Sequence, residues 1–174
     1  MDRNELCKEI FKKSHLTGEF LLRSGQTSNE YFDKYRFEAD PKLLKAIAAQ
    51  MSSMIPEGTQ ILAGLEIGGI PIATAMSLYT GIPAAFVRKE AKSYGTCRLA
   101  EGADVKGKNV CIIEDVITTG GQVIESTYQL RECGAKVDHV LCAIYRGYGM
   151  PKKINEINLK MRSLFTMDEL KSVN

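Results

Sequence analysis

The segment from Val110 to Gln122, "VCIIEDVITTGGQ", is the most informative part of the sequence for the fold. An apolar run typical of a buried strand ends in two adjacent acids, Glu114 and Asp115, and a loop of threonines and glycines then leads into a segment of helical period. In open parallel sheets, ligands bind beyond the carboxyl ends of the strands. The order of strand, acids, loop and helix therefore predicts both a parallel sheet and the position of its binding site.

The loop after the acids has the chemistry of a phosphate site. Successive backbone N–H groups of a glycine-containing loop can point into one hollow, and the following helix adds positive potential behind them. Glu114 and Asp115 would repel a phosphate but can accept hydrogen bonds from hydroxyls. A ribose 5-phosphate satisfies both requirements, with its hydroxyls on the acids and its phosphate on the loop. The predicted phosphate-loop residues are Thr118, Thr119, Gly120, Gly121 and Gln122.

Two other phosphate motifs are excluded by the spacing. No lysine follows the glycines as in a Walker loop, and GxGxxG is absent. The alternative to a ribose phosphate site is that Glu114 and Asp115 are merely charged residues at a strand end and that the glycines form a common turn.

Other segments repeat the alternation of strand and helix. Further apolar strands are predicted at 61–65 ("ILAGL"), 84–88 ("AAFVR") and 136–145 ("KVDHVLCAIY"), and helices are predicted from Asp40 with Pro41 at its first position, from near Pro71, and from Gln122 to Cys133. Short apolar strands alternating with helices indicate an α/β fold with a parallel sheet flanked by helices. We expect this core to span residues 40–174.

The first 39 residues differ in character and are predicted to form a small N-terminal hood. Residues 2–13 have the spacing of an amphipathic helix, and "GEFLLRSGQTSNEYFDKYRF" indicates two short β segments around a Ser-Gly turn. Tyr31, Phe32, Tyr35 and Phe37 are expected to mark the second segment. With 174 residues, of which 44% are hydrophobic, hood and core together suit a single domain, 1–174.

Composition limits the partners and the compartment. A net charge of +2 argues against a nucleic-acid polymer as an obligatory partner. The five cysteines form no CxxC pair, which suits free thiols in a reducing cytosol and suggests neither zinc nor disulfides. No signal-peptide core or membrane-spanning run is present, so we expect a cytoplasmic protein that does not bind membranes.

A long connection follows the strand at 84–88. Residues 89–108, "KEAKSYGTCRLAEGADVKGK", hold Lys89, Lys92 and Arg98, and the segment is long enough to predict a functional basic flap. The alternative is a solvated run of charges.

Together these segments resemble the type I phosphoribosyltransferases, whose substrate is 5-phosphoribosyl 1-pyrophosphate (PRPP). "GEFLLRSGQTSNEYFD" is similar to the hood of the orotate-specific members, "VRKEAKSYG" to their mobile catalytic loop, and "GLEIGGIPIA" to their pyrophosphate-side loop. "RSLFTMDEL" is similar to the segment that closes many members. The resemblance covers essentially the whole chain and is most specific for the orotate-using group.

This resemblance implies a Mg²⁺-dependent transfer of the phosphoribosyl group from PRPP to orotate, giving orotidine 5′-monophosphate and pyrophosphate in pyrimidine biosynthesis. Mg²⁺ would be held mainly by PRPP, with no direct protein ligand, and the enzyme would be a homodimer with shared active sites. The implied catalytic residues are Lys92, Lys89, Arg88 and Asp115. PRPP would contact these residues, Glu114, the phosphate loop and Tyr94, and orotate would contact Arg23, Tyr31, Phe32, Thr118 and Arg146.

The chain departs from the family pattern at a few positions. Arg23 replaces a lysine of many members, Tyr94 replaces a loop histidine, and Gly68 replaces a lysine found in some members. No aspartate directly precedes Arg146, although many members have one there. These changes concern pyrophosphate handling and base choice, so two alternatives stay open: transfer to another nucleobase, and a non-catalytic PRPP-binding regulator.

Overall fold

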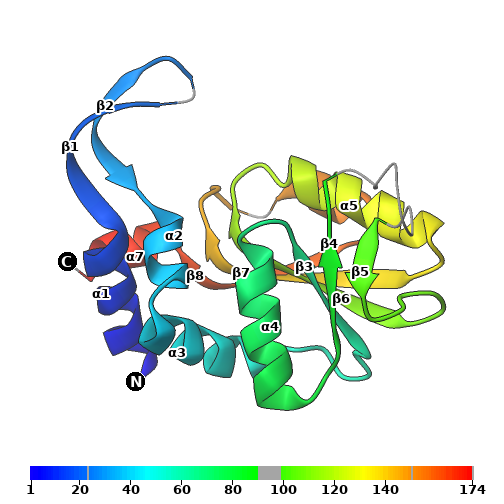
Figure 1. Cartoon of the computed structure of the whole chain (residues 1–174). Helices are drawn as coiled ribbons and strands as arrows, with labels where there is room; N and C mark the ends of the chain where they lie inside the picture. Colours follow the sequence, from blue (N-terminus) through cyan, green and yellow to red (C-terminus); the bar gives the residue numbers. More distant parts are fainter. Residues whose placement is uncertain (23, 90–98, 150, 174) are drawn as a thin grey trace.

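The centre of this computed structural model is a six-stranded sheet, whose strand order is β5-β4-β3-β6-β7-β8 (Figure 1). The structure describes residues 1–22, 24–89, 99–149 and 151–173. All neighbouring strands pair in parallel except β4 and β5, which are antiparallel. The strands are β3 (Ile61–Leu65), β4 (Ala84–Val87), β5 (Ala100–Gly102), β6 (Asn109–Ile117), β7 (Lys136–Tyr145) and β8 (Lys160–Thr166).

Helices cover both faces of this sheet (Figure 1). The helices α3 (Pro41–Ser52) and α4 (Gly69–Thr80) pack on one face, and α5 (Gly121–Glu132) and the short α6 (Lys152–Glu156) pack on the other. The Asp40 side chain caps α3 by accepting hydrogen bonds from the backbone N–H groups of Lys42 and Leu43 at 3.0 and 3.3 Å. Helix α3 therefore begins where the Asp-Pro pair predicts.

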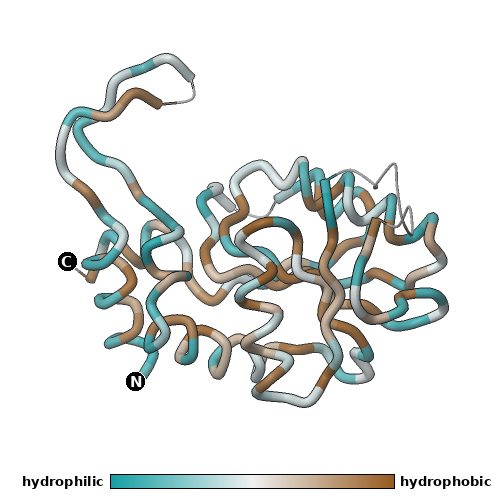
Figure 2. The backbone as a smooth tube through the Cα atoms, in the orientation of Figure 1, coloured by the Kyte–Doolittle hydropathy of each residue, from teal (hydrophilic) through white to brown (hydrophobic). Residues whose placement is uncertain are grey.

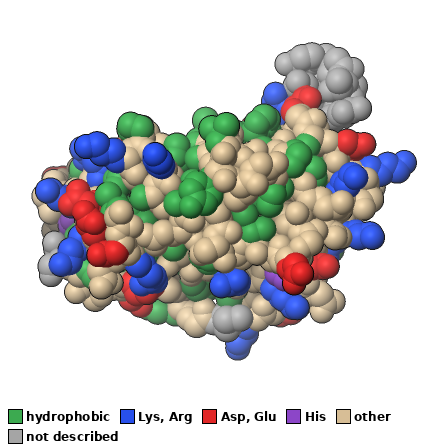
Figure 3. Space-filling view, turned by 90° about the horizontal axis from the view of Figure 1, so that it is seen from below, with side chains coloured by type: hydrophobic (Ala, Val, Ile, Leu, Met, Phe, Trp, Pro, Cys, Tyr) green, Lys and Arg blue, Asp and Glu red, His purple; other side chains and the backbone are tan. Residues whose placement is uncertain are grey.

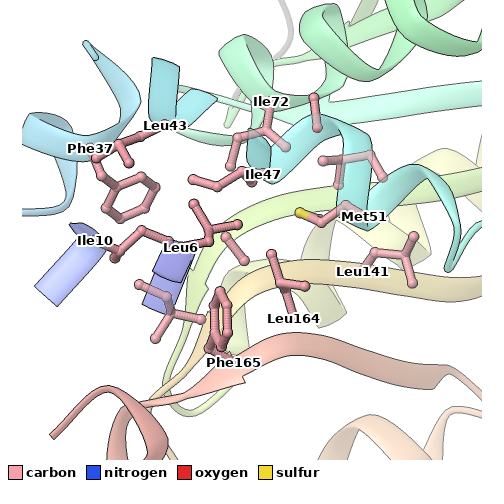
Figure 4. Close-up of a cluster of buried hydrophobic side chains, with 14 of the residues drawn as sticks. Leu6, Ile10, Phe37, Leu43, Ile47, Met51, Ile72, Leu141, Leu164 and Phe165 are labelled. Carbon is pink, nitrogen blue, oxygen red and sulfur yellow. The ribbon is translucent and has the colours of Figure 1, made fainter. Parts of the chain in front are cut away.

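Alternation along the strands divides the core into two clusters. On β6, Cys111 and Ile113 belong to the cluster under α3 and α4, whereas Val110 and Ile112 belong to the cluster under α5. Successive side chains of a strand point to opposite faces, so a strand covered on both faces must be apolar throughout. In Figure 2 the central strands of the sheet are coloured largely as hydrophobic. Figure 4 shows the cluster under α3 and α4, in which Leu141 of β7 and Met51 of α3 point into the same interior.

One part of the N-terminal region packs into the hydrophobic cluster under α3 and α4, and another part extends away from the sheet. The helix α1 (Arg3–Ser14) buries Leu6 and Ile10 completely, and both lie beside Phe37 in Figure 4. The antiparallel hairpin of β1 (His15–Leu21) and β2 (Thr27–Phe32) extends away from the sheet in Figure 1.

One prediction for this region is wrong. Tyr35 and Phe37 do not continue the second β segment but lie on the helix α2 (Lys34–Glu38). The Asp33 side chain caps this helix by accepting from the Tyr35 N–H at 3.2 Å, and Phe37 is then fully buried on the core side. An aspartate cap thus overrides the β preference of the aromatic residues.

The four predicted strands of the core are confirmed, whereas β5 and β8 were not predicted as strands. Residues 100–102 of the expected flap pair with β4, so this part is an edge strand of the sheet and not a loop. The chain then ends in α7 (Met167–Ser172), with the capping box of Thr166 and Glu169. Within the described residues, no helix is both long and apolar enough to cross a membrane.

Candidate active site

The predicted phosphate loop lies at the carboxyl end of β6 and lines a cavity of about 400 Å³. All of its residues from Thr118 to Gln122 contribute to the wall, together with Glu114, Glu66 and Lys89. Gly120 has a φ of +79°, and a Cβ there would lie 2.6 Å from the Cδ1 of Ile154. A side chain at this position would require the Ile154 side chain to move and would have to adopt the left-handed backbone conformation.

The loop presents the N-terminus of α5 to the cavity. Gly120 directly precedes α5, and no side-chain hydrogen bond caps this end of the helix. The Ile124 N–H donates a hydrogen bond to the Gly120 carbonyl at 2.9 Å. The first amides of a helix have no carbonyl partner within the helix. Those of 121–123 can therefore donate to an anion, as the sequence predicts for a phosphate.

The two acids of the motif occupy different environments. Glu114 lines the cavity and is 9% exposed, whereas Asp115 is 0% exposed. Asp115 Oδ1 accepts a hydrogen bond from the Val116 N–H at 2.5 Å, and its Oδ2 lies 2.5 Å from the Nζ of Lys34. A Cβ on residue 68 would lie 1.7 Å from the same Oδ2, so the side chain of Asp115 occupies space that Gly68 leaves open.

Lys34, Glu38, Glu114 and Asp115 form a buried charge cluster. Burial, followed by the hydrogen bond and charge of Asp115, raises the pKa of Glu114 to about 10 and that of Glu38 to about 9. Burial alone would raise the pKa of Asp115, but hydrogen bonds from Glu114, Glu38 and Lys34 lower it overall. Near neutral pH the cluster thus holds one carboxylate, one ammonium and two protonated carboxyls, and it carries no net charge.

The predicted pyrophosphate-side cations are only partly brought together. Lys89 lines the cavity, and its backbone N–H donates to Glu66 Oε1 at 2.5 Å. Arg88 is not on this wall, and its Nε lies 4.0 Å from Glu101 of β5. Lys92 and Tyr94 lie outside the described residues.

The predicted base-binding residues line a second cavity of about 400 Å³. Tyr31 and Phe32 of β2 lie on its wall with Arg146, whose Cζ is 5.4 Å from the centre of the Phe32 ring. Thr118 lines this cavity and the phosphate cavity alike. Arg23, the other residue predicted to contact the base, lies outside the described part of the chain.

Sequence reasoning missed Lys34, Glu38 and Glu66. The first two lie on α2, which packs against α1 and α3, and they reach Asp115 only through the tertiary placement of that helix. Glu66 lies in the segment "GLEIGGIPIA", which resembles the pyrophosphate-side loop of the family, but no role was predicted for this acid. Among the described residues, no group of three or more His, Cys, Asp or Glu side chains could hold a metal ion.

Comparison with known proteins agrees with this geometry. Residues 36–163 match the family described as the phosphoribosyl transferase domain, and the chain therefore belongs to that family. An orotate phosphoribosyltransferase of Nocardioides sp. is 53% identical over 95% of this chain and 92% of its own length. A crystal structure of orotate phosphoribosyltransferase from Mycobacterium tuberculosis has a TM-score of 0.88 and 30% identity, covering 98% of this chain and 99% of the other.

A second Mycobacterium tuberculosis structure of that enzyme, in complex with PRPP, has a TM-score of 0.84 and 27% identity, again covering 98% of this chain and 99% of the other. Within the phosphoribosyltransferases the chain groups with the orotate phosphoribosyltransferases.

Proposed function

We propose that this protein transfers the phosphoribosyl group of PRPP to orotate, releasing pyrophosphate and forming orotidine 5′-monophosphate in pyrimidine biosynthesis. The observation that carries the proposal is Thr118, which lines both the phosphate cavity and the cavity of Tyr31, Phe32 and Arg146. A ribose anchored by its 5′-phosphate in the first cavity presents its anomeric carbon toward a base in the second. The names of the relatives supply the identity of the base.

Each part of the chain has a distinct task in this reaction. The α5 amides and the threonines of the loop bind the 5′-phosphate, and Glu114 accepts hydrogen bonds from ribose hydroxyls. Arg146 offers orotate a planar guanidinium for its carboxylate, beside the aromatic wall of the hairpin. Lys89, with Arg88 and Lys92 as family resemblance implies, stabilises the departing pyrophosphate.

Mg²⁺ fits this site as a companion of the substrate. Among the residues that the structure describes, no group of three or more His, Cys, Asp or Glu side chains is placed to hold a metal ion, and Asp115 is already paired with Lys34. The ion would be held by PRPP oxygens and would neutralise part of the pyrophosphate charge. We further propose a cytoplasmic homodimer with shared active sites.

The test is a spectrophotometric assay of the purified protein with PRPP and Mg²⁺, offering orotate, uracil, adenine and hypoxanthine separately. We expect consumption of orotate alone, with release of pyrophosphate and dependence on Mg²⁺. Consumption of another base would replace orotate as the substrate. If PRPP raises the melting temperature but no base is consumed, the protein is a PRPP-binding regulator and the proposed activity is wrong.

A further inference from the structure

Lys34 is a cation of the phosphate cavity that the motifs of the sequence do not include. It begins α2, and its side chain lines the same cavity as the loop of residues 118–122. The side chain is 33% exposed, while the carboxylate that it contacts, Asp115, is completely buried. One end of this ion pair is therefore fixed in the interior and the other faces the cavity.

The ammonium of Lys34 has donors left for a ligand. An ammonium carries three N–H donors, and its one ion-pair contact among the described residues is with Asp115 Oδ2, 2.5 Å from the Nζ. The attraction of Asp115 outweighs the effect of burial and raises the pKa of Lys34, so the side chain stays charged across the working pH range. A charged, partly exposed ammonium held by a buried carboxylate is suited to bind an anion.

Its position indicates which part of the substrate it meets. The oxygen of Asp115 that contacts Lys34 is the one that fills the space beside Gly68. Gly68 follows β3 and precedes α4, whereas the 5′-phosphate loop follows β6 and precedes α5. Lys34 is thus on the β3 side of the site, whereas the loop proposed to bind the 5′-phosphate is on the β6 side. The anomeric carbon is at the opposite end of the ribose from the 5′-phosphate, so its substituent can reach Lys34.

The charge balance of the cavity favours the same assignment. Among the described residues, its wall has two cations, Lys34 and Lys89, and two acids, Glu66 and Glu114, and the raised pKa of Glu114 keeps that carboxyl protonated near neutral pH. PRPP adds a phosphate and a diphosphate, so each cation near the anomeric side lowers the electrostatic cost of binding.

We propose that Lys34 binds the pyrophosphate group of PRPP and that Asp115 holds its ammonium in position. This rests on the proposed function, because it takes PRPP as the substrate. The competing explanation is a structural ion pair that joins α2 to β6 and does not touch the ligand.

Three ligands separate these explanations. PRPP and pyrophosphate carry the diphosphate, whereas ribose 5-phosphate carries the 5′-phosphate alone. We expect Lys34→Gln to weaken binding of PRPP and of pyrophosphate by roughly 10- to 100-fold, as for loss of a charged hydrogen bond, and to leave ribose 5-phosphate within about twofold. Dissociation constants are measured by calorimetry at fixed Mg²⁺.

The variants are chosen to keep the fold. Glutamine can still donate a hydrogen bond to Asp115, and Lys34→Arg, which keeps the charge, should recover most of the affinity for PRPP. Lys13→Gln is the matched control, because Lys13 forms a 3.0 Å ion pair with Asp40 away from the cavity. This control should bind all three ligands like the unmodified protein.

Equal weakening of all three ligands by Lys34→Gln, or no weakening of any, would overturn the proposal in favour of the structural ion pair. A melting temperature measured for each variant shows whether folding is affected. Failure of the proposed function looks different: the unmodified protein would then not consume orotate, or would not bind PRPP.

Discussion

Gly120 shapes the phosphate loop in two ways, through its backbone and through the space that it leaves. Its φ of +79° is unfavourable for other residues, and a Cβ would lie 2.6 Å from Ile154. A left-handed conformation costs a residue with a side chain about 1–2 kcal/mol, so Gly120→Ala should lower the melting temperature by roughly 2–8 °C and weaken binding of ribose 5-phosphate. Scanning calorimetry with and without ribose 5-phosphate measures both effects.

Gly121 provides the control for this prediction. A Cβ there would have the Thr119 hydroxyl, at 4.0 Å, as its near neighbour, and Gly121 has no positive φ. Gly121→Ala should therefore keep the melting temperature. Equal melting temperatures for both variants would show that the shape of the loop does not depend on residue 120.

Glu38 gives the protein a pH dependence of stability. Its pKa is raised from 4.5 to about 9, first by burial and then by Asp115, so between these values the folded state keeps a proton that the unfolded state releases. The free energy of unfolding must then fall as the pH rises toward about 9. Glu38→Gln removes this titration, and its stability relative to the unmodified protein should increase by more than about 1 kcal/mol between pH 5 and pH 9.

Urea unfolding at several pH values measures this difference, with the exposed Glu57→Gln as control. Part of the alkaline loss should persist in the variant, because Glu114 also has a raised pKa, of about 10. A constant stability difference across the pH range would contradict the buried, protonated state of Glu38.

The residues of the charge cluster show which parts of the site can be predicted from the sequence and which cannot. Glu114 and the loop after it were predictable because strand, acids, glycines and helix are contiguous in sequence. Lys34 and Glu38 lie far from them in the chain, on a five-residue helix whose aromatic residues suggested a strand. Their approach to Asp115 is a product of tertiary packing and has no local signal.

At the scale of elements, an ion pair joins the β1–β2 hairpin to the C-terminal helix α7. Glu30 of β2 accepts from the Lys171 Nζ of α7 at 3.0 Å and lies 2.9 Å from the His15 Nε2. Glu30 directly precedes Tyr31 and Phe32, which line the base cavity. This contact therefore positions the aromatic wall of the proposed orotate site.

We expect Lys171→Ala to raise the KM for orotate about two- to fivefold, as an exposed ion pair allows, without a change in the KM for PRPP. Because Lys171 and Glu30 also line the base cavity, a double-mutant cycle is needed. If they act as a pair, Glu30→Gln combined with Lys171→Ala should cost no more than either change alone. Additive losses would instead indicate that each side chain contacts the base separately.

The strands differ in how clearly their sequence pattern predicts them. The strands β3, β6 and β7 are buried on both faces and read as continuous apolar runs, so they were predicted. The strand β8 lies at the sheet edge with a mixed pattern of burial, and β5 has three residues inside a segment rich in charge and glycine. Short or half-exposed edge strands take their conformation from the neighbouring strand, which a single segment does not reveal.

For the whole molecule, an apolar surface on α3 and α4 bears on the proposed homodimer. Figure 3 views the lower end of the molecule in Figure 1 and shows hydrophobic side chains gathered on this face. Leu78 and Tyr79 of α4 are 86% and 63% exposed, and they border a hollow with Leu44 and Ala48 of α3. A contiguous apolar surface of this kind is unfavourable in water and typical of a protein interface.

A second copy of the chain is the occupant that the proposed shared active sites require. Leu78→Glu would place a charge in that interface, where desolvation is costly, and should convert the dimer to monomers in sedimentation equilibrium. Activity should fall with it, because the proposed active sites are shared between the two copies. Tyr128→Glu, at an exposed position of α5, should remain dimeric and active. A Leu78→Glu protein that stays dimeric would place the interface elsewhere, and an unmodified protein that is monomeric yet active would refute the shared sites.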